Sequence, residues 1–178
     1  FRVDMDVVRE KALEVRPTVL VPWLLKKRGQ PELVGRASRV HGPHADMVRA
    51  LHAELQVPCE ELGSVQSLRQ ALVEKYTFIL TINALGLERD ETLGELLLSV
   101  PSRVEALARE AAELGADRAR TTVDEEACVA ATRDAMQALS GIKARGRTAG
   151  ERVLRALRDA KNLGIATPML DDVAQKLR

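Results

Sequence analysis

Apolar residues recur at helical spacing across the stretch from Ser64 to Leu87. Ser64 is a good N-cap residue for such a helix. The second half of the stretch, residues 76–87, is apolar nearly all round, which is typical of a helix that other elements cover on every side. We therefore predict a long helix over about residues 64–87 at the centre of the fold.

Shorter helical patterns fill most of the chain after His41. Pro43 suits a first helical turn, Ser102 is a good N-cap residue, and Thr122 with Glu125 fits a capping box. We expect these helices over residues 43–56, 92–98, 102–114, 122–139, 150–163 and 169–177. Strands and helices do not alternate, so the predicted fold class is all-α, a compact bundle of six or seven helices around the central one.

The first 40 residues have a less regular pattern. Residues 4–15 could form a short amphipathic helix, and residues 26–31 read as a charged turn. Residues 18–23 are rich in β-formers, but Pro17 and Pro22 favour an extended edge segment. We expect two parts: an irregular N-terminal arm or linker over residues 1–40, and a helical domain over residues 41–178.

Composition agrees with one domain built mainly from helices. The chain has 178 residues, of which 46% are hydrophobic and only 2% aromatic, so Leu, Val and Ala must supply the core. The 27 basic and 26 acidic residues nearly balance, whereas a nucleic-acid-binding protein usually has a clear basic excess. Seven basic residues against two acidic ones gather between Lys143 and Lys161. We interpret this run as a solvated helix face, with an anion or RNA site as the alternative.

Cysteine and histidine usage favours neither a disulfide framework nor a metal site. Cys59 and Cys128 lie far apart among apolar residues, which suits a reducing compartment such as the cytoplasm or an organelle matrix or stroma. His41, His44 and His52 lack a fourth ligand at matching spacing. No apolar run reaches the roughly 18 residues of a membrane-spanning helix, so we expect a soluble protein. The first residue is Phe rather than Met, and we expect a processed product or a fragment.

Motifs for nucleotide binding are missing from the sequence. No two glycines stand two positions apart, so the glycine-rich dinucleotide fingerprint is absent. Residues 141–148 come within one residue of a phosphate-binding loop, but Arg147 stands where that loop needs lysine, and a helical segment precedes it. We therefore expect no cofactor to bind within this chain.

Lys75 and Asn83 are the candidate functional pair on the central helix. They lie eight residues apart, about two turns, and so project from one side of the helix. An asparagine buried without a partner costs about 1–3 kcal/mol. Asn83 should therefore bond either to a neighbouring helix or to a ligand.

Several segments resemble the C-terminal helical domain of the ketopantoate reductase family, a domain like that of 6-phosphogluconate dehydrogenase. Residues 68–87, with Lys75 and Asn83, resemble the central helix of that family. Gly94, Glu95 and Leu96 follow as the family's next short element, and residues 57–59 and 162–168 resemble its entry segment and closing turn. The similarity covers about residues 35–178, with the pieces in the family's order.

The resemblance implies a substrate site. Lys75 would donate a proton and polarise the substrate carbonyl, and Asn83 would bind substrate through its amide. The family's carboxylate falls near Thr148, and Glu151, three residues on, is the candidate for it. Ile79 stands where the family carries a second asparagine. The family binds NADPH on an N-terminal Rossmann domain that this sequence does not contain.

Three functions follow from this reading. We favour a non-catalytic structural or protein-interaction subunit derived from this domain, with a protein partner or a second copy covering its free faces. The alternative is the C-terminal substrate and dimerisation domain of an NADPH-dependent 2-dehydropantoate 2-reductase-like enzyme whose Rossmann half lies outside this chain. A third reading is a helical module that binds RNA or another anion through residues 143–161, although near-neutral charge argues against nucleic acid.

Overall fold

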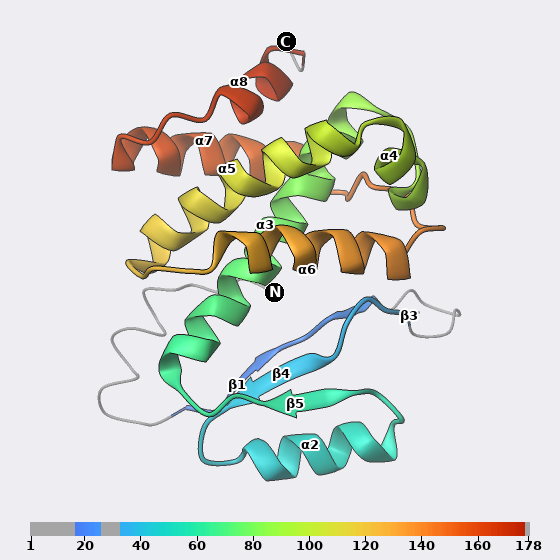
Figure 1. Cartoon of the computed structure of the whole chain (residues 1–178), viewed down its shortest axis with the longest axis vertical. Coiled ribbons are helices and arrows are strands. Elements are labelled where there is room, and N and C mark those ends of the chain that lie inside the picture. The colour runs from blue at the N-terminus through green and yellow to red at the C-terminus, as the bar shows by residue number, and fades with distance from the viewer. Residues whose placement is uncertain (1–16, 26–32, 177–178) are drawn as a thin grey trace.

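A computed structural model describes residues 17–25 and 33–176. The possible helix at residues 4–15 and the turn at 26–31 lie outside the described residues. Figure 1 shows two layers, a bundle of helices and a small β layer with one helix on its outer side. Helix α3 (Val65–Glu88) starts beside the β layer and runs through the bundle.

The β layer contains a three-stranded sheet in the order β1-β4-β5. Strand β1 (Val19–Val21) pairs antiparallel with β4 (Ser38–His41), and β4 pairs parallel with β5 (Cys59–Glu61). Helix α2 (Ala45–Glu54) connects β4 to β5, so residues 38–61 form one β-α-β unit. A second, two-stranded ribbon joins β2 (Leu24–Leu25) to β3 (Leu33–Val34).

This β-α-β unit corrects the expectation that strands and helices do not alternate. Strand β5 has three residues, two of them exposed glutamates, so it carries neither an apolar run nor a full alternation. Its strand conformation depends on pairing with residues 38–40, which are distant in the sequence. Strand β1 does form an extended edge strand, within the segment for which the sequence predicts one.

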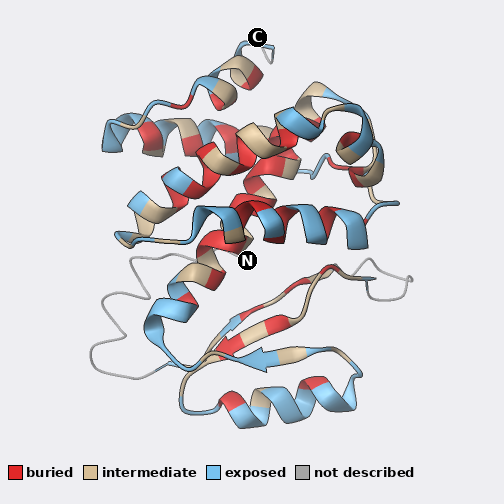
Figure 2. Ribbon diagram, viewed as in Figure 1, coloured by how far each residue is buried: buried red, intermediate tan, exposed pale blue. Residues whose placement is uncertain are grey.

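Helix α3 is the buried centre of the bundle, as the apolar pattern predicts. Ser64 caps it by accepting a hydrogen bond from the backbone N–H of Ser67. Buried residues run along the helix from Leu68 to Gly86, whereas its first turn is exposed, as Figure 2 shows. Helices α5, α6, α7 and α8 and strands β1 and β4 all contact it. The central helix therefore positions the elements that pack directly on it in both layers.

The helical class is confirmed, with seven helices among the described residues. Besides α2 and α3 these are α4 (Leu93–Ser99), α5 (Pro101–Ala119), α6 (Glu125–Ala138), α7 (Ala149–Leu163) and α8 (Pro168–Gln175). Within the described part of the chain, none is long and apolar enough to cross a membrane. The short α4 begins with a complete capping box between Thr92 and Glu95.

Several helix ends differ from the sequence prediction. Helix α2 begins at Ala45, after Pro43, and the N-cap of α5 is Val100 rather than Ser102. Helix α5 continues through Gly115 and ends where Arg120 adopts a left-handed conformation, with φ of 47°. Gly115 stays helical because the Tyr76 ring packs against it, with Cδ1 only 2.9 Å from where a Cβ would stand. The N-cap of α6 is Asp124, which accepts from the backbone of Ala127, and not Thr122.

Two contacts attach the β layer to α3. Trp23, just after β1, is buried, and its ring centroid lies 5.4 Å from that of Phe78. Glu74 is also buried and accepts hydrogen bonds from Arg36 at 3.1 Å and Arg39 at 2.8 Å. Breaking a buried ion pair from one side costs about 3–5 kcal/mol, so Glu74 fixes the layer firmly to the helix.

Gly86 is required near the end of α3 because the loop before α7 crosses it at close range. A Cβ on Gly86 would stand 2.6 Å from the Cα of Arg145, and backbone cannot move aside cheaply. We expect Gly86→Ala to lower the free energy of unfolding by about 1–3 kcal/mol. Urea denaturation followed by circular dichroism measures this change.

Gly150→Ala is the matched control, because Gly150 lies in α7 with nothing within 4 Å of its Cβ position. Alanine is the better helix former there and should raise stability by about 0.5–1 kcal/mol. Equal effects of the two substitutions would contradict the close contact at Gly86.

Candidate functional site

A cavity of about 520 Å³ lies where α3 meets α5, α7 and strand β1. Two helices line much of it at one-face spacing: α3 with Leu72, Lys75, Tyr76 and Ile79, and the start of α7 with Thr148, Glu151, Arg152 and Arg155. The lining is completed by Leu20, Val21, Pro22, Val73, Leu80, Gly115, Arg118 and Ala119. Both layers of the fold therefore contribute to the cavity.

Lys75 is the central polar group of this cavity. Its Nζ lies over two aromatic rings, 4.5 Å from the ring centroid of Trp23 and 5.3 Å from that of Phe78. No carboxylate pairs with it among the residues that the structure describes. Burial, together with the smaller effect of the Arg152 charge, lowers the pKa of Lys75 to about 8. The two ring faces attract the ammonium and oppose this decrease.

The other charges of the lining are mostly positive. Arg118 forms an ion pair with Asp159 at 2.8 Å and lies over the ring of Tyr76. The Nε of Arg152 donates to the hydroxyl of Thr148 at 3.0 Å, which holds the guanidinium near the start of α7. Arg155 adds a further positive charge, against one carboxylate from Glu151. This arrangement favours an anionic ligand.

Tyr76 and the apolar wall shape the rest of the cavity. Burial raises the pKa of Tyr76, so its phenol stays protonated at neutral pH. Ile79 lies one turn beyond Lys75, where the resemblance expects a second asparagine, and presents an apolar surface with Leu72 and Leu80. A ligand here would meet charge on the α7 side, and on the α3 side hydrocarbon together with the amine of Lys75.

The structure brings together two of the three predicted site residues. Lys75 and Glu151 line the same cavity, whereas Asn83 is outside its lining. The Nδ2 of Asn83 donates to the carbonyl oxygen of Ile79 at 2.6 Å, within its own helix rather than to a neighbouring one. Its buried Oδ1 has no partner among the described residues and lies where a Cβ on Gly146 would approach to 2.8 Å.

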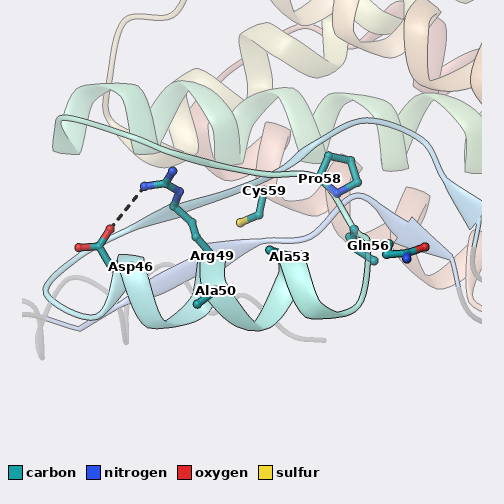
Figure 3. A pocket seen from close by; sticks show the side chains of 8 residues that line it. Asp46, Arg49, Ala50, Ala53, Gln56, Pro58 and Cys59 are labelled. Atoms are coloured by element: carbon teal, nitrogen blue, oxygen red, sulfur yellow. Dashed lines mark hydrogen bonds and ion pairs between the residues drawn. The ribbon is translucent and has the colours of Figure 1, made fainter.

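A second hollow, of about 620 Å³, lies between α2 and β5 (Figure 3). Most of its lining side chains are exposed, and its charged groups are engaged: Arg49 pairs with Asp46 at 3.4 Å and with Glu61 at 3.4 Å. Burial raises the pKa of Cys59, which keeps the thiol protonated. This hollow is larger, but its charged groups already form ion pairs and its thiol is protonated. The Lys75 cavity is therefore the better candidate site.

Sequence reasoning missed the arginines of the site and the role of Trp23. Arg152 and Arg155 belong to the basic run that the sequence analysis interprets as a solvated face, and only their i, i+4 spacing from Thr148 and Glu151 hints at a shared wall. Arg118 comes from α5, far from both other segments in sequence. The ring of Trp23, the single tryptophan, packs beneath the Nζ of Lys75.

Comparison with protein-family models, curated proteins and solved structures gives no match for this chain in any of the three.

The lowered pKa of Lys75 makes a prediction about stability. Its folded value of about 8 lies below the unfolded value of 10.5, so the unfolded chain binds more protons between these pH values. Charged Lys75 therefore destabilises the fold fully below pH 8, and the penalty disappears as pH rises towards 10.5. We expect Lys75→Met to stabilise the fold by about 1–2 kcal/mol at pH 7 and by almost nothing at pH 10.5.

Urea denaturation at a series of pH values, with Lys161→Met as the exposed-lysine control, measures this difference. Subtracting the stability of the variant from that of the unaltered chain at each pH cancels the contributions of groups that do not interact with Lys75. A stability difference that stays constant with pH would refute the prediction.

Proposed function

We propose that this chain is the substrate-binding helical half of a ketopantoate reductase-like protein, and that its cavity binds a small organic anion. The observation that carries the proposal is Lys75, a partly buried lysine on a cavity wall with no carboxylate pairing it among the described residues. A buried charge without a partner is costly, and an anionic ligand would remove that cost. The resemblance to the reductase family names 2-oxo acids such as ketopantoate as the ligand class.

The nucleotide half of such an enzyme would come from outside the described residues. The described sheet has one parallel strand pair, and the turn between β4 and α2 holds a single glycine, Gly42. A dinucleotide site needs several glycines at that turn. The residues in hand do not fit NADPH, so the role we assign to this chain is binding and orientation of the substrate.

Trp23 allows a direct binding test, because ligand charge next to Lys75 changes the environment of the indole. Titration with ketopantoate should change the tryptophan emission with saturation. Lys75→Met should weaken the binding at least about tenfold, the loss expected for a charge-assisted contact of about 1.5–3 kcal/mol. Lys161→Met should bind as the unaltered chain does.

Two results would contradict the proposal. One is an emission change that Lys75→Met leaves intact, which would separate binding from this cavity. The other is ordinary turnover of ketopantoate with NADPH by this chain alone, which would show that the nucleotide half is not elsewhere.

A second candidate, the protein-interaction subunit, is supported by the outer face of α2. Met47, Leu51 and Leu55 stand four residues apart and are 68%, 55% and 65% exposed. Large apolar side chains aligned on one helix face are typical of an interface. The partner that the sequence suggests is a protein or a second copy of this chain.

Sedimentation equilibrium tests the version with a second copy. We expect the chain to self-associate and Leu51→Glu to shift it towards monomer by at least about tenfold in dissociation constant, because a charge would be buried in the interface. Leu98→Glu is the control, since Leu98 is 86% exposed but stands alone on α4. Monomer at all concentrations, or the same shift with Leu98→Glu, would remove this candidate.

A further inference from the structure

The surroundings of Lys75 suit an amine that reacts as well as one that forms ion pairs. We propose that Lys75 is a nucleophilic lysine that forms an imine with a small 2-oxo acid held in the cavity. This inference rests on the proposed binding of an organic anion at the same cavity. It goes further, because a bond between Nζ and a ligand carbon is not needed for binding.

The position of Lys75 differs from that of the other described lysines. Lys143 pairs with Asp90 at 3.3 Å, and Lys176 pairs with Glu88 at 2.7 Å and Asp172 at 2.9 Å, so both are held as ammonium ions. Lys161 is exposed to water. Lys75 instead lies over two aromatic rings, which attract its ammonium, while burial and the neighbouring cation of Arg152 favour the neutral amine.

The charges of the cavity wall select the ligand class. Arg152 and Arg155 offer guanidinium groups to a carboxylate, which can accept two parallel hydrogen bonds from one of them. In a 2-oxo acid the ketone carbon is directly bonded to the carboxylate carbon. When the carboxylate is bound to the α7 wall, we expect the adjacent ketone to face the α3 wall, which carries Lys75. The apolar side of the ligand would contact Leu72 and Ile79.

The reaction is balanced without any further reagent. The lone pair of neutral Nζ forms a bond to the ketone carbon, and the π electrons of the carbonyl move to oxygen, which takes up a proton. The resulting carbinolamine loses its hydroxyl group with a proton as water, while nitrogen forms the C=N bond. One amine and one ketone give one imine and one water. Glu151 provides a carboxylate on the same wall for the proton that nitrogen releases.

Reductive trapping of the full chain tests the proposal. The protein is incubated with pyruvate and sodium cyanoborohydride, which converts an imine into a stable secondary amine, and the adduct is located by peptide mass spectrometry. We expect an adduct on Lys75 whose rate saturates with pyruvate and exceeds that on exposed Lys161 by at least about tenfold, since more of Lys75 is neutral at pH 7. Lys75→Arg should abolish that adduct, and Lys161→Arg should leave it unchanged.

Lactate, which has the carboxylate but no ketone, separates the two proposals. Lactate should change the Trp23 emission and form no adduct. It should also protect Lys75 from reaction with pyruvate, and this protection is measured in the unaltered chain without any variant. If both acids change the emission but Lys75 is never trapped, the imine is refuted and anion binding stands. If neither acid changes the emission and nothing is trapped, both proposals fail. Trapping on Lys75 that is no faster than on Lys161, or that does not saturate, also overturns the imine.

Discussion

The fold depends on one constraint, which is that the second half of helix α3 is apolar on nearly every side and must be covered all round. A helix of 24 residues offers more apolar surface than one partner can bury. Helices α5, α6, α7 and α8 cover its second half, and the β layer covers its beginning through Trp23 and the ion pairs of Glu74. The two-layer arrangement thus follows from the need to shield a single element.

The candidate site lies where this cover changes from sheet to helices. Strand β1 ends and helix α7 begins on opposite sides of Lys75, and the cavity fills the space between them. The same burial that stabilises α3 removes water from the Lys75 ammonium and lowers its pKa to about 8. The burial that stabilises the helix is therefore also what lowers the pKa of this lysine. Asn83, two turns further along, lies under the helical cover and bonds within its own helix.

Long, regular patterns made most of the fold predictable, and long-range contacts account for what was missed. Helix 65–88 has a pattern of many turns, whereas three-residue β5 exists only through its pairing with β4. In the sequence Gly115 predicts a helix end, but in the structure it lies within a helix and the ring of Tyr76 packs against it. Lys75 and Glu151, which the family resemblance suggests as site residues, line one cavity, but Arg118 has no local signal that could place it there.

Because its walls come from both layers, the cavity makes ligand binding and interlayer packing thermodynamically linked. A molecule that touches β1, α3 and α7 at once can bind fully only while the β layer stays docked on the bundle. Ligand binding must then shift the equilibrium towards docked layers. The size of this shift equals the factor by which separating the layers weakens the affinity for the ligand. Hydrogen exchange at the amides of the β1–β4 pairing would then slow on binding.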